Sequence, residues 1–94
     1  MAALLMATSC VGRPADDASG ADIYQQLCAR CHGEGLEGAT GPAIGMGSNS
    51  AAQPDSFLVS AITQGRGRMP SFGTVLSDPQ LERLVLFLRD SQQP

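Results

Sequence analysis

A five-residue motif constrains this chain more than any other feature of its 94 residues. Cys28 and Cys31 are separated by two residues, and His32, the only histidine of the chain, follows directly. Two thiols about one helical turn apart can reach the two vinyl groups on one edge of a haem. The adjacent imidazole can then take the proximal position on the iron. The motif therefore predicts one covalently bound haem c, attached at Cys28 and Cys31, with His32 as an iron ligand.

Three other interpretations of this motif are weaker. A structural zinc site needs four ligands, and only Cys10 remains to join the pair and His32. A thioredoxin-like redox pair needs alternating strands and helices around it, which this sequence pattern lacks. A plain disulfide explains both cysteines but not the adjacent histidine.

The composition agrees with a small domain that a cofactor holds together. A chain of 94 residues with 11 glycines and only 4% aromatic residues buries a modest core. Such domains usually need disulfides, a metal or an organic cofactor. The net charge is −3 and all six basic residues are arginines, which excludes the basic face of a nucleic-acid-binding protein. No apolar run approaches the roughly 20 residues of a membrane-spanning helix.

Periodicity predicts an all-α fold. Ser77 and Gln80 form a capping-box pattern before an apolar stripe at helical spacing, and Gly65 is expected to end the preceding helix. The expected helices cover residues 21–31, 54–64 and 77–88, and the expected Gly-rich loops cover 33–47 and 65–76. The fold class is therefore all-α, with three to four helices and Gly-rich loops wrapped around one haem.

The first twenty residues differ in character from the rest. Residues 1–9 are small and apolar and lead to Cys10, like the tail of a bacterial export signal that ends at a lipid-modified cysteine. The segment is short and has no basic residue before Arg13, so cleavage without a lipid and a plain tail stay open as alternatives. We expect a signal-like or lipoprotein-like segment and a flexible linker over 1–20, and one monohaem domain over 21–94.

A chain with one histidine must fill the sixth position of the iron with another group. Met69 lies in a loop where Gly65 and Gly67 let the backbone approach a ring closely. Pro70 follows directly and stiffens the backbone on both sides of the peptide bond. We expect Met69 as the second ligand, and the alternatives are Met46 or a sixth position that is open or filled by another group.

These motifs together resemble a small class I bacterial cytochrome c. The residues that carry the resemblance are Cys28–His32, Gly41–Ile44, Met69-Pro70 and the apolar helix over 81–88. The resemblance covers about residues 21–90, nearly all of the expected domain. The cysteine motif is highly specific, the Met-Pro pair is moderately so, and the Gly-Pro pair is weak alone.

The resemblance implies a cytochrome c fold, in which an N-terminal and a C-terminal helix cross near the haem. It implies that the carbonyl of Pro42 accepts a hydrogen bond from the proximal imidazole of His32. It also implies that Tyr24 and Phe87 lie where the terminal helices touch. Family members receive haem c outside the bacterial inner membrane, so we expect a periplasmic or exported protein, tethered to the membrane if Cys10 is lipidated.

Ligation by histidine and methionine predicts electron transfer rather than enzymatic activity, because it leaves no place for a small-molecule substrate. We expect a one-electron carrier between periplasmic or membrane redox proteins, or the haem subunit of a larger respiratory complex. The alternative is a haem enzyme or gas sensor with an open or displaceable sixth ligand. Arg66 and Arg68, just before Met69, are expected to dock an acidic partner, to pair with a haem propionate, or to be merely solvated.

Overall fold

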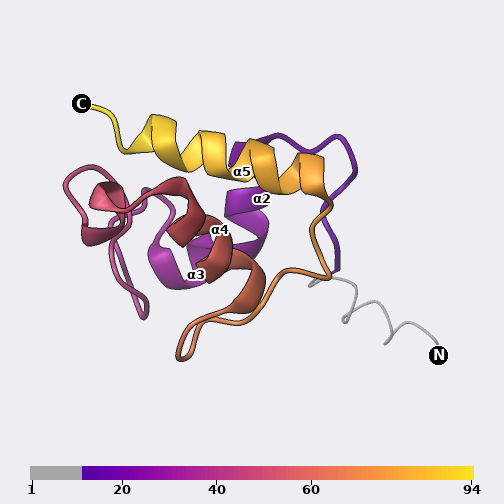
Figure 1. Cartoon of the computed structure of the whole chain (residues 1–94), viewed down its shortest axis with the longest axis horizontal. Coiled ribbons are helices and arrows are strands. Elements are labelled where there is room, and N and C mark those ends of the chain that lie inside the picture. Colours follow the sequence, from indigo (N-terminus) through magenta and orange to yellow (C-terminus); the bar gives the residue numbers. More distant parts are fainter. Residues whose placement is uncertain (1–11) are drawn as a thin grey trace.

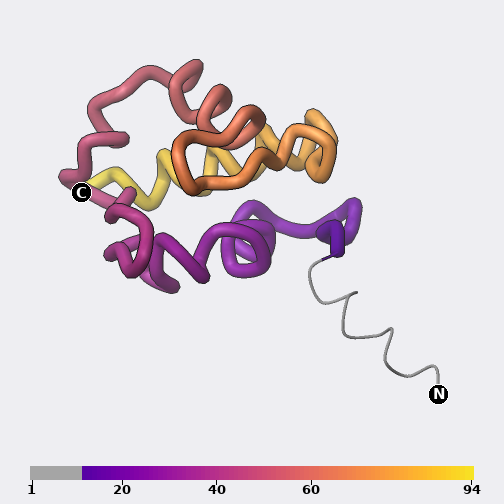
Figure 2. The backbone as a smooth tube through the Cα atoms, turned by 90° about the horizontal axis from the view of Figure 1, so that it is seen from below, coloured from indigo at the N-terminus to yellow at the C-terminus, as the bar shows by residue number. Residues whose placement is uncertain are grey.

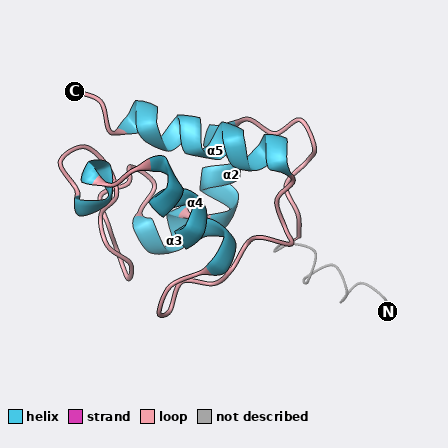
Figure 3. Cartoon of the chain, viewed as in Figure 1, coloured by secondary structure: helices cyan, strands magenta, loops and turns pink. Residues whose placement is uncertain are grey.

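The structure is a computed structural model, and it describes residues 12–94. The expected signal-like segment and Cys10 lie outside these residues. Within them the chain forms helices joined by loops, without a strand, which confirms the all-α class (Figure 3). The elements are α2 (Gly20–Leu27), α3 (Ala29–His32), the 3-10 helix η1 (Asn49–Ala52), α4 (Asp55–Gln64) and α5 (Asp78–Ser91).

The helical stretch that carries the cysteine motif begins one residue earlier than expected and is interrupted once. Helix α2 begins where the Ser19 hydroxyl accepts a hydrogen bond from the Asp22 N–H at 3.0 Å. The interruption falls at Cys28, whose φ of −113° departs from helical geometry. Hydrogen bonds still cross it, from the Cys28 N–H to Tyr24 O at 2.8 Å and from the His32 N–H to Cys28 O at 3.0 Å. The motif therefore lies on a kinked stretch close to the single helix expected.

The two later helices begin where the sequence predicts. Helix α4 follows Pro54 and ends at Gly65. Before α5 both capping-box bonds are present, from the Gln80 N–H to Ser77 Oγ at 3.2 Å and from the Ser77 N–H to Gln80 Oε1 at 2.8 Å. Helix α5 continues to Ser91, beyond the expected range, because no glycine or proline interrupts its last turn.

Helices α2 and α5 cross in close contact at Gly20 (Figure 1). A Cβ at Gly20 would overlap the carbonyl oxygen of Arg83 and lie 2.8 Å from Phe87 Cβ, so this approach of the backbones requires glycine. One turn further on, the rings of Tyr24 and Phe87 pack with centroids 5.5 Å apart at an angle of 42°. The contact of the terminal helices through Tyr24 and Phe87 is therefore confirmed.

The segment before α2 is bound along α5, although its composition suggests a solvated linker. Gln80 Nε2 donates to Ala15 O at 3.0 Å, and Arg83 Nε donates to Ala18 O at 2.9 Å. Pro14 is buried in the same contact region. Long side chains of α5 thus satisfy the carbonyls of a segment that has no secondary structure of its own.

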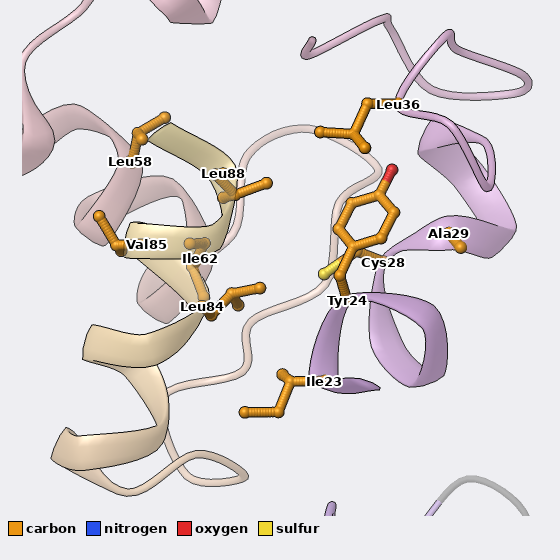
Figure 4. Close-up of a cluster of buried hydrophobic side chains, with 10 residues drawn as sticks. All are labelled: Ile23, Tyr24, Cys28, Ala29, Leu36, Leu58, Ile62, Leu84, Val85 and Leu88. Atoms are coloured by element: carbon orange, nitrogen blue, oxygen red, sulfur yellow. The ribbon is translucent and has the colours of Figure 1, made fainter. Parts of the chain in front are cut away.

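The hydrophobic core lies between α2, α4 and α5 (Figure 4). Its largest fully buried side chains are Tyr24, Ile23 and Leu84. Burial of such a side chain contributes about 1.5–3 kcal/mol to folding. The other buried members of the cluster are Cys28, Ala29, Leu36, Leu58, Ile62, Val85 and Leu88. The first cysteine of the motif is therefore part of the core.

The chain is arranged as two halves beside a shared helix (Figure 2). Residues 12–47 run along one side and residues 49–76 run along the other, and α5 passes behind the second of these halves. The cysteine motif and Met69 therefore come from different halves. Among residues 12–94, no helix has the length and apolar character needed to cross a bilayer.

Candidate haem site

The two motif cysteines lie in different surroundings. Cys28 is buried and Cys31 is exposed, and both line the same cavity. Burial, with a smaller contribution from the charge of Cys31, raises the pKa of the Cys28 thiol to about 12. Among residues 12–94, no group of three or more His, Cys, Asp and Glu side chains is placed to hold a metal ion.

His32 is buried at the end of α3, and a main-chain carbonyl orients its ring. Its Nδ1–H donates to Pro42 O at 2.7 Å, which is the contact that the family resemblance implies. This bond fixes the tautomer, leaves Nε2 to bind a metal, and makes the imidazole a stronger electron donor. Gly41 permits the approach, because a Cβ there would lie 3.2 Å from Cys31 O and 3.4 Å from His32 Cε1.

Hydrogen bonds also fix the turn that follows His32. Gly41 N–H donates to Cys31 O and Gly38 N–H donates to His32 O, each at 2.7 Å. Gly33 ends α3 with φ 90° and ψ 149°, a backbone conformation that is nearly restricted to glycine. The position of the imidazole thus follows from a short, closely bonded turn.

Tyr24 extends from α2 to the same turn. Its side chain is fully buried, and its hydroxyl donates to Gly33 O at 2.7 Å. Desolvation, followed by the charges of Cys28 and Glu37, raises the pKa of Tyr24 to about 12. The hydroxyl therefore keeps its proton and remains a donor at neutral pH.

The loop that carries Met69 is fixed mainly through its own backbone. Arg66 and Met69 form an isolated bridge, with Met69 N–H donating to Arg66 O at 2.8 Å and the reverse bond at 3.2 Å. The Phe72 N–H then donates to Ile62 O at 2.9 Å, which joins the loop to the last turns of α4. Gly65 has a φ of 79°, and a Cβ there would lie 2.6 Å from Met69 O. Gly65 therefore ends α4 as expected, and its lack of a side chain allows the close approach of the Met69 carbonyl.

A cavity of about 1100 Å³ brings the predicted site residues together. Cys28, Cys31, His32 and Met69 all line it, whereas Met46 is 65% exposed and is not among its lining residues. Its volume slightly exceeds the range of roughly 300–1,000 Å³ for small-molecule and cofactor sites, so it can hold a large cofactor. Two thiols, an imidazole and a thioether around one such space fit the attachment of haem c and the His/Met ligation found in cytochromes c.

Three arginines, Arg30, Arg66 and Arg68, also line this cavity. The guanidinium of Arg66 lies over the Phe57 ring, 4.8 Å from its centroid. All three arginines are exposed. Arg66 and Arg68 thus lie near Met69 as expected. Sequence reasoning missed Arg30, although its place between the two motif cysteines could have marked it.

A polar cluster at the end of α5 forms part of the cavity wall and was not predicted. Gln92 Nε2 donates to Ile44 O at 2.9 Å and to Ser50 Oγ at 3.3 Å. Arg89 forms an ion pair with Asp55 at 2.7 Å and donates to Gln92 Oε1 at 2.8 Å. The cluster connects α5 with α4, η1 and the Gly-rich loop. A single glutamine near a chain end follows no sequence pattern that could have revealed it.

Comparison with known proteins assigns the chain to a family. Residues 15–88 match the family model described as cytochrome c oxidase, cbb3-type, subunit III. The chain belongs to this family of c-type cytochromes. It is similar to cytochrome c6 of Leptolyngbya boryana, with 29% identity over 82 residues that cover 84% of this chain and 96% of the relative.

The match with two further proteins covers a smaller share of their length. The menaquinol:cytochrome c reductase cytochrome c subunit of Bacillus subtilis (strain 168) is 34% identical over 77 residues, which cover 80% of this chain and 29% of that subunit. The structure of cytochrome cL from Hyphomicrobium denitrificans has a TM-score of 0.71 and 28% identity, covering 79% of this chain and 46% of that chain.

Family membership establishes the fold, the cofactor and the general function. The fold is that of class I cytochromes c. As a c-type cytochrome, the chain binds haem c covalently and transfers electrons. Its partners are other redox proteins, because an electron carrier needs a donor and an acceptor.

Proposed function

We propose that His32 and Met69 are the axial ligands of the haem iron, and that the chain carries single electrons between periplasmic or membrane redox partners, as a free carrier or as a subunit of a larger complex. The observation that carries this proposal is that both side chains line the cavity that Cys28 and Cys31 also line. Haem c, when bound, supplies reversible one-electron chemistry at its iron. The chain then has no catalytic residue and no small-molecule substrate.

The two proposed ligands have complementary properties. The hydrogen bond from His32 to Pro42 O strengthens the imidazole as an electron donor. The thioether of Met69 is a soft ligand that favours ferrous iron and raises the reduction potential. Both groups lie on closely bonded turns, so a change of iron oxidation state requires little movement of the chain. Such a centre is suited to electron transfer.

Substitution of Met69 tests the ligand assignment. In Met69→Ala we expect the covalent haem to remain, the weak red absorption band of methionine-bound ferric iron to vanish, and the potential to fall. The fall should be a substantial part of the roughly 0.8 V range that axial ligation spans in haem proteins. Visible spectroscopy and redox titration of the purified protein measure both.

Met46→Ala is the matched control, because Met46 is exposed. This substitution should leave the methionine absorption band and the reduction potential unchanged. A band lost in Met46→Ala and kept in Met69→Ala would transfer the ligand assignment to Met46. Ready binding of carbon monoxide by wild-type ferrous protein would instead support the alternative of a gas sensor or haem enzyme with a displaceable sixth ligand.

We propose the Arg66–Arg68 turn as the docking surface for an acidic redox partner. Both arginines are exposed at the cavity that the haem would fill, on a chain whose net charge is −3. A local positive patch on an acidic molecule orients an approaching partner and accelerates association at low salt. The patch lies beside Met69, so docking there would bring the partner close to the iron.

Neutralisation of this patch gives a salt-dependent effect. In the double variant Arg66→Gln and Arg68→Gln, we expect the electron-transfer rate with an acidic protein partner to fall several-fold at low ionic strength and to converge with wild type at high salt. Stopped-flow kinetics measure the rates. Arg13→Gln is the control, since Arg13 lies away from the cavity and hydrogen-bonds to Thr74 O. An equal loss of rate in Arg13→Gln would contradict docking at Arg66 and Arg68.

Export and membrane attachment depend on the N-terminal segment. We propose an exported protein, with Cys10 as the site of a lipid tether, on the basis of the small apolar residues before it. Mass spectrometry of the native protein would report the start of the chain, acyl groups on Cys10 and haem on Cys28 and Cys31 in one measurement. Copurification with redox enzymes from detergent extracts would separate a free carrier from a subunit of a complex.

A further inference from the structure

The carbonyls at the end of the cysteine motif accept hydrogen bonds from different parts of the chain. Those of Cys31 and His32 accept from main-chain N–H groups of the loop that follows, each at 2.7 Å. The next carbonyl, that of Gly33, accepts from the Leu36 N–H of the loop at 3.1 Å and, more closely, from the Tyr24 hydroxyl at 2.7 Å. Tyr24 thus contributes a side-chain contact that comes from outside the loop.

Tyr24 is itself firmly placed. Its side chain is fully buried, and its ring packs against Phe87 of α5 (Figure 4 shows its place in the core). One turn earlier, Gly20 allows α2 to contact α5 backbone to backbone. The hydroxyl is therefore a fixed donor on the crossing of the two helices.

We propose that the Tyr24 hydroxyl is a positioning group for the iron-binding imidazole of His32, and that it connects this ligand to the crossing of α2 and α5. Two contacts hold His32. Its ring is hydrogen-bonded to Pro42 O, and the carbonyl of Gly33, the next residue, accepts from the Tyr24 hydroxyl. If the second contact is lost, the turn relaxes and the bond from His32 Nδ1 to Pro42 O lengthens. A weaker hydrogen bond makes the imidazole a poorer donor, which favours ferrous iron. The inference rests on the proposed ligation of iron by His32.

Tyr24→Phe removes the hydroxyl and keeps the aromatic ring, so it tests this role directly. In the purified ferric holoprotein we expect changed paramagnetic NMR shifts of the His32 ring protons, and an increased reduction potential. Ser77→Ala is the matched control, because it removes one hydrogen bond at the start of α5, away from the cavity. It should lower stability to a similar degree and leave the shifts and the potential at wild-type values.

A second measurement avoids the removal of a buried group. Tyr24 is the only tyrosine of the chain, so growth on 3-fluorotyrosine labels this position alone. The fluorinated phenol is a stronger hydrogen-bond donor, and we expect it to shift the reduction potential in the opposite direction, below wild type. This test remains valid if Tyr24→Phe fails to fold.

Two results would overturn the proposal. One is a Tyr24→Phe protein that loses stability as Ser77→Ala does but keeps the wild-type His32 shifts and potential. The other is a fluorinated protein with an unchanged potential. Failure of the proposed function is recognised separately, in the wild type, by His32 ring protons without paramagnetic shifts or by the absence of the methionine band.

Discussion

A glycine ends the helix beside each of the two proposed iron ligands. The hydrogen bonds that hold the chain around these two ligands differ. Gly33 follows His32 with φ 90°, and Gly65 precedes the Met69 turn with φ 79°. On the histidine side, the ring of His32 donates a hydrogen bond to Pro42 O, which fixes its orientation. The turn after His32 is hydrogen-bonded to its own loop and to Tyr24 of α2. On the methionine side, the loop is bonded to itself and to the end of α4.

This difference assigns unequal roles to the two sides. An imidazole N–H forms a strong directional hydrogen bond, whereas a thioether is only a weak acceptor. The histidine can therefore be held directly, and the methionine must be held through its backbone. We expect the histidine side to determine whether haem is retained, and the methionine side to determine how firmly the sixth position is closed.

Loss of the histidine should have the largest effect. In His32→Ala, produced in a host competent in cytochrome maturation, we expect little or no covalent haem, because the proximal ligand is gone. Met69→Ala should retain a full complement. Mass spectrometry and the haem absorbance per chain measure the difference. Equal haem content in the two variants would contradict the expectation that the histidine side determines whether haem is retained.

A methyl group on the methionine side should have an intermediate effect. Gly65→Ala places a Cβ 2.6 Å from Met69 O at a φ of 79°, and strain of this kind costs about 1–3 kcal/mol. Gly67→Ala is the matched control, since Gly67 also has a positive φ, of 54°, but no atom within 4 Å of the added group. Denaturant unfolding followed at the haem and at the methionine band should show Gly65→Ala as clearly less stable. Equal unfolding midpoints would mean that the backbone contact at Gly65 does not hold the loop.

The smallest effect concerns alkaline pH and the histidine side. The pKa of Tyr24 is about 12 in the folded chain, against an ordinary value of 10.0. Between these values the folded protein keeps a proton that the unfolded chain releases, so this contribution to stability is complete below pH 10 and is lost as pH rises toward 12. The free energy of unfolding, measured across this range, should fall more steeply in wild type than in Tyr24→Phe. Parallel profiles would show that Tyr24 does not titrate in this way.

Local sequence predicted much of the site. The cysteine motif and the capping box at Ser77 each lie within a few residues, so their geometry follows from helical spacing. Met69 was predicted because glycines and Pro70 around it signal a stiff loop. The structure gives the motif a helical stretch and α5 its cap, and it places Met69 at the cavity, where its role as a ligand stays a prediction.

The remainder depends on residues far apart in the chain. The sequence pattern places Gly20 at the end of a linker, because nothing local shows that Arg83 lies against it. Other long-range hydrogen bonds are equally hidden from local sequence. They run from Gln80 and Arg83 to the segment before α2, and from Gln92 to Ile44 O. Such contacts are fixed by tertiary packing, which periodicity and turn signals do not report.

The crossing of α2 and α5 brings together opposite ends of the sequence. Arg83 and Ala18 hydrogen-bond across 65 positions, and closing so long a loop carries an entropic cost that a local turn avoids. The stretch from Tyr24 to His32, by contrast, can form within a single helical segment. Haem attachment to this stretch therefore does not require the contact between α2 and α5, and α5 would then fold onto an N-terminal helical stretch that already carries the haem.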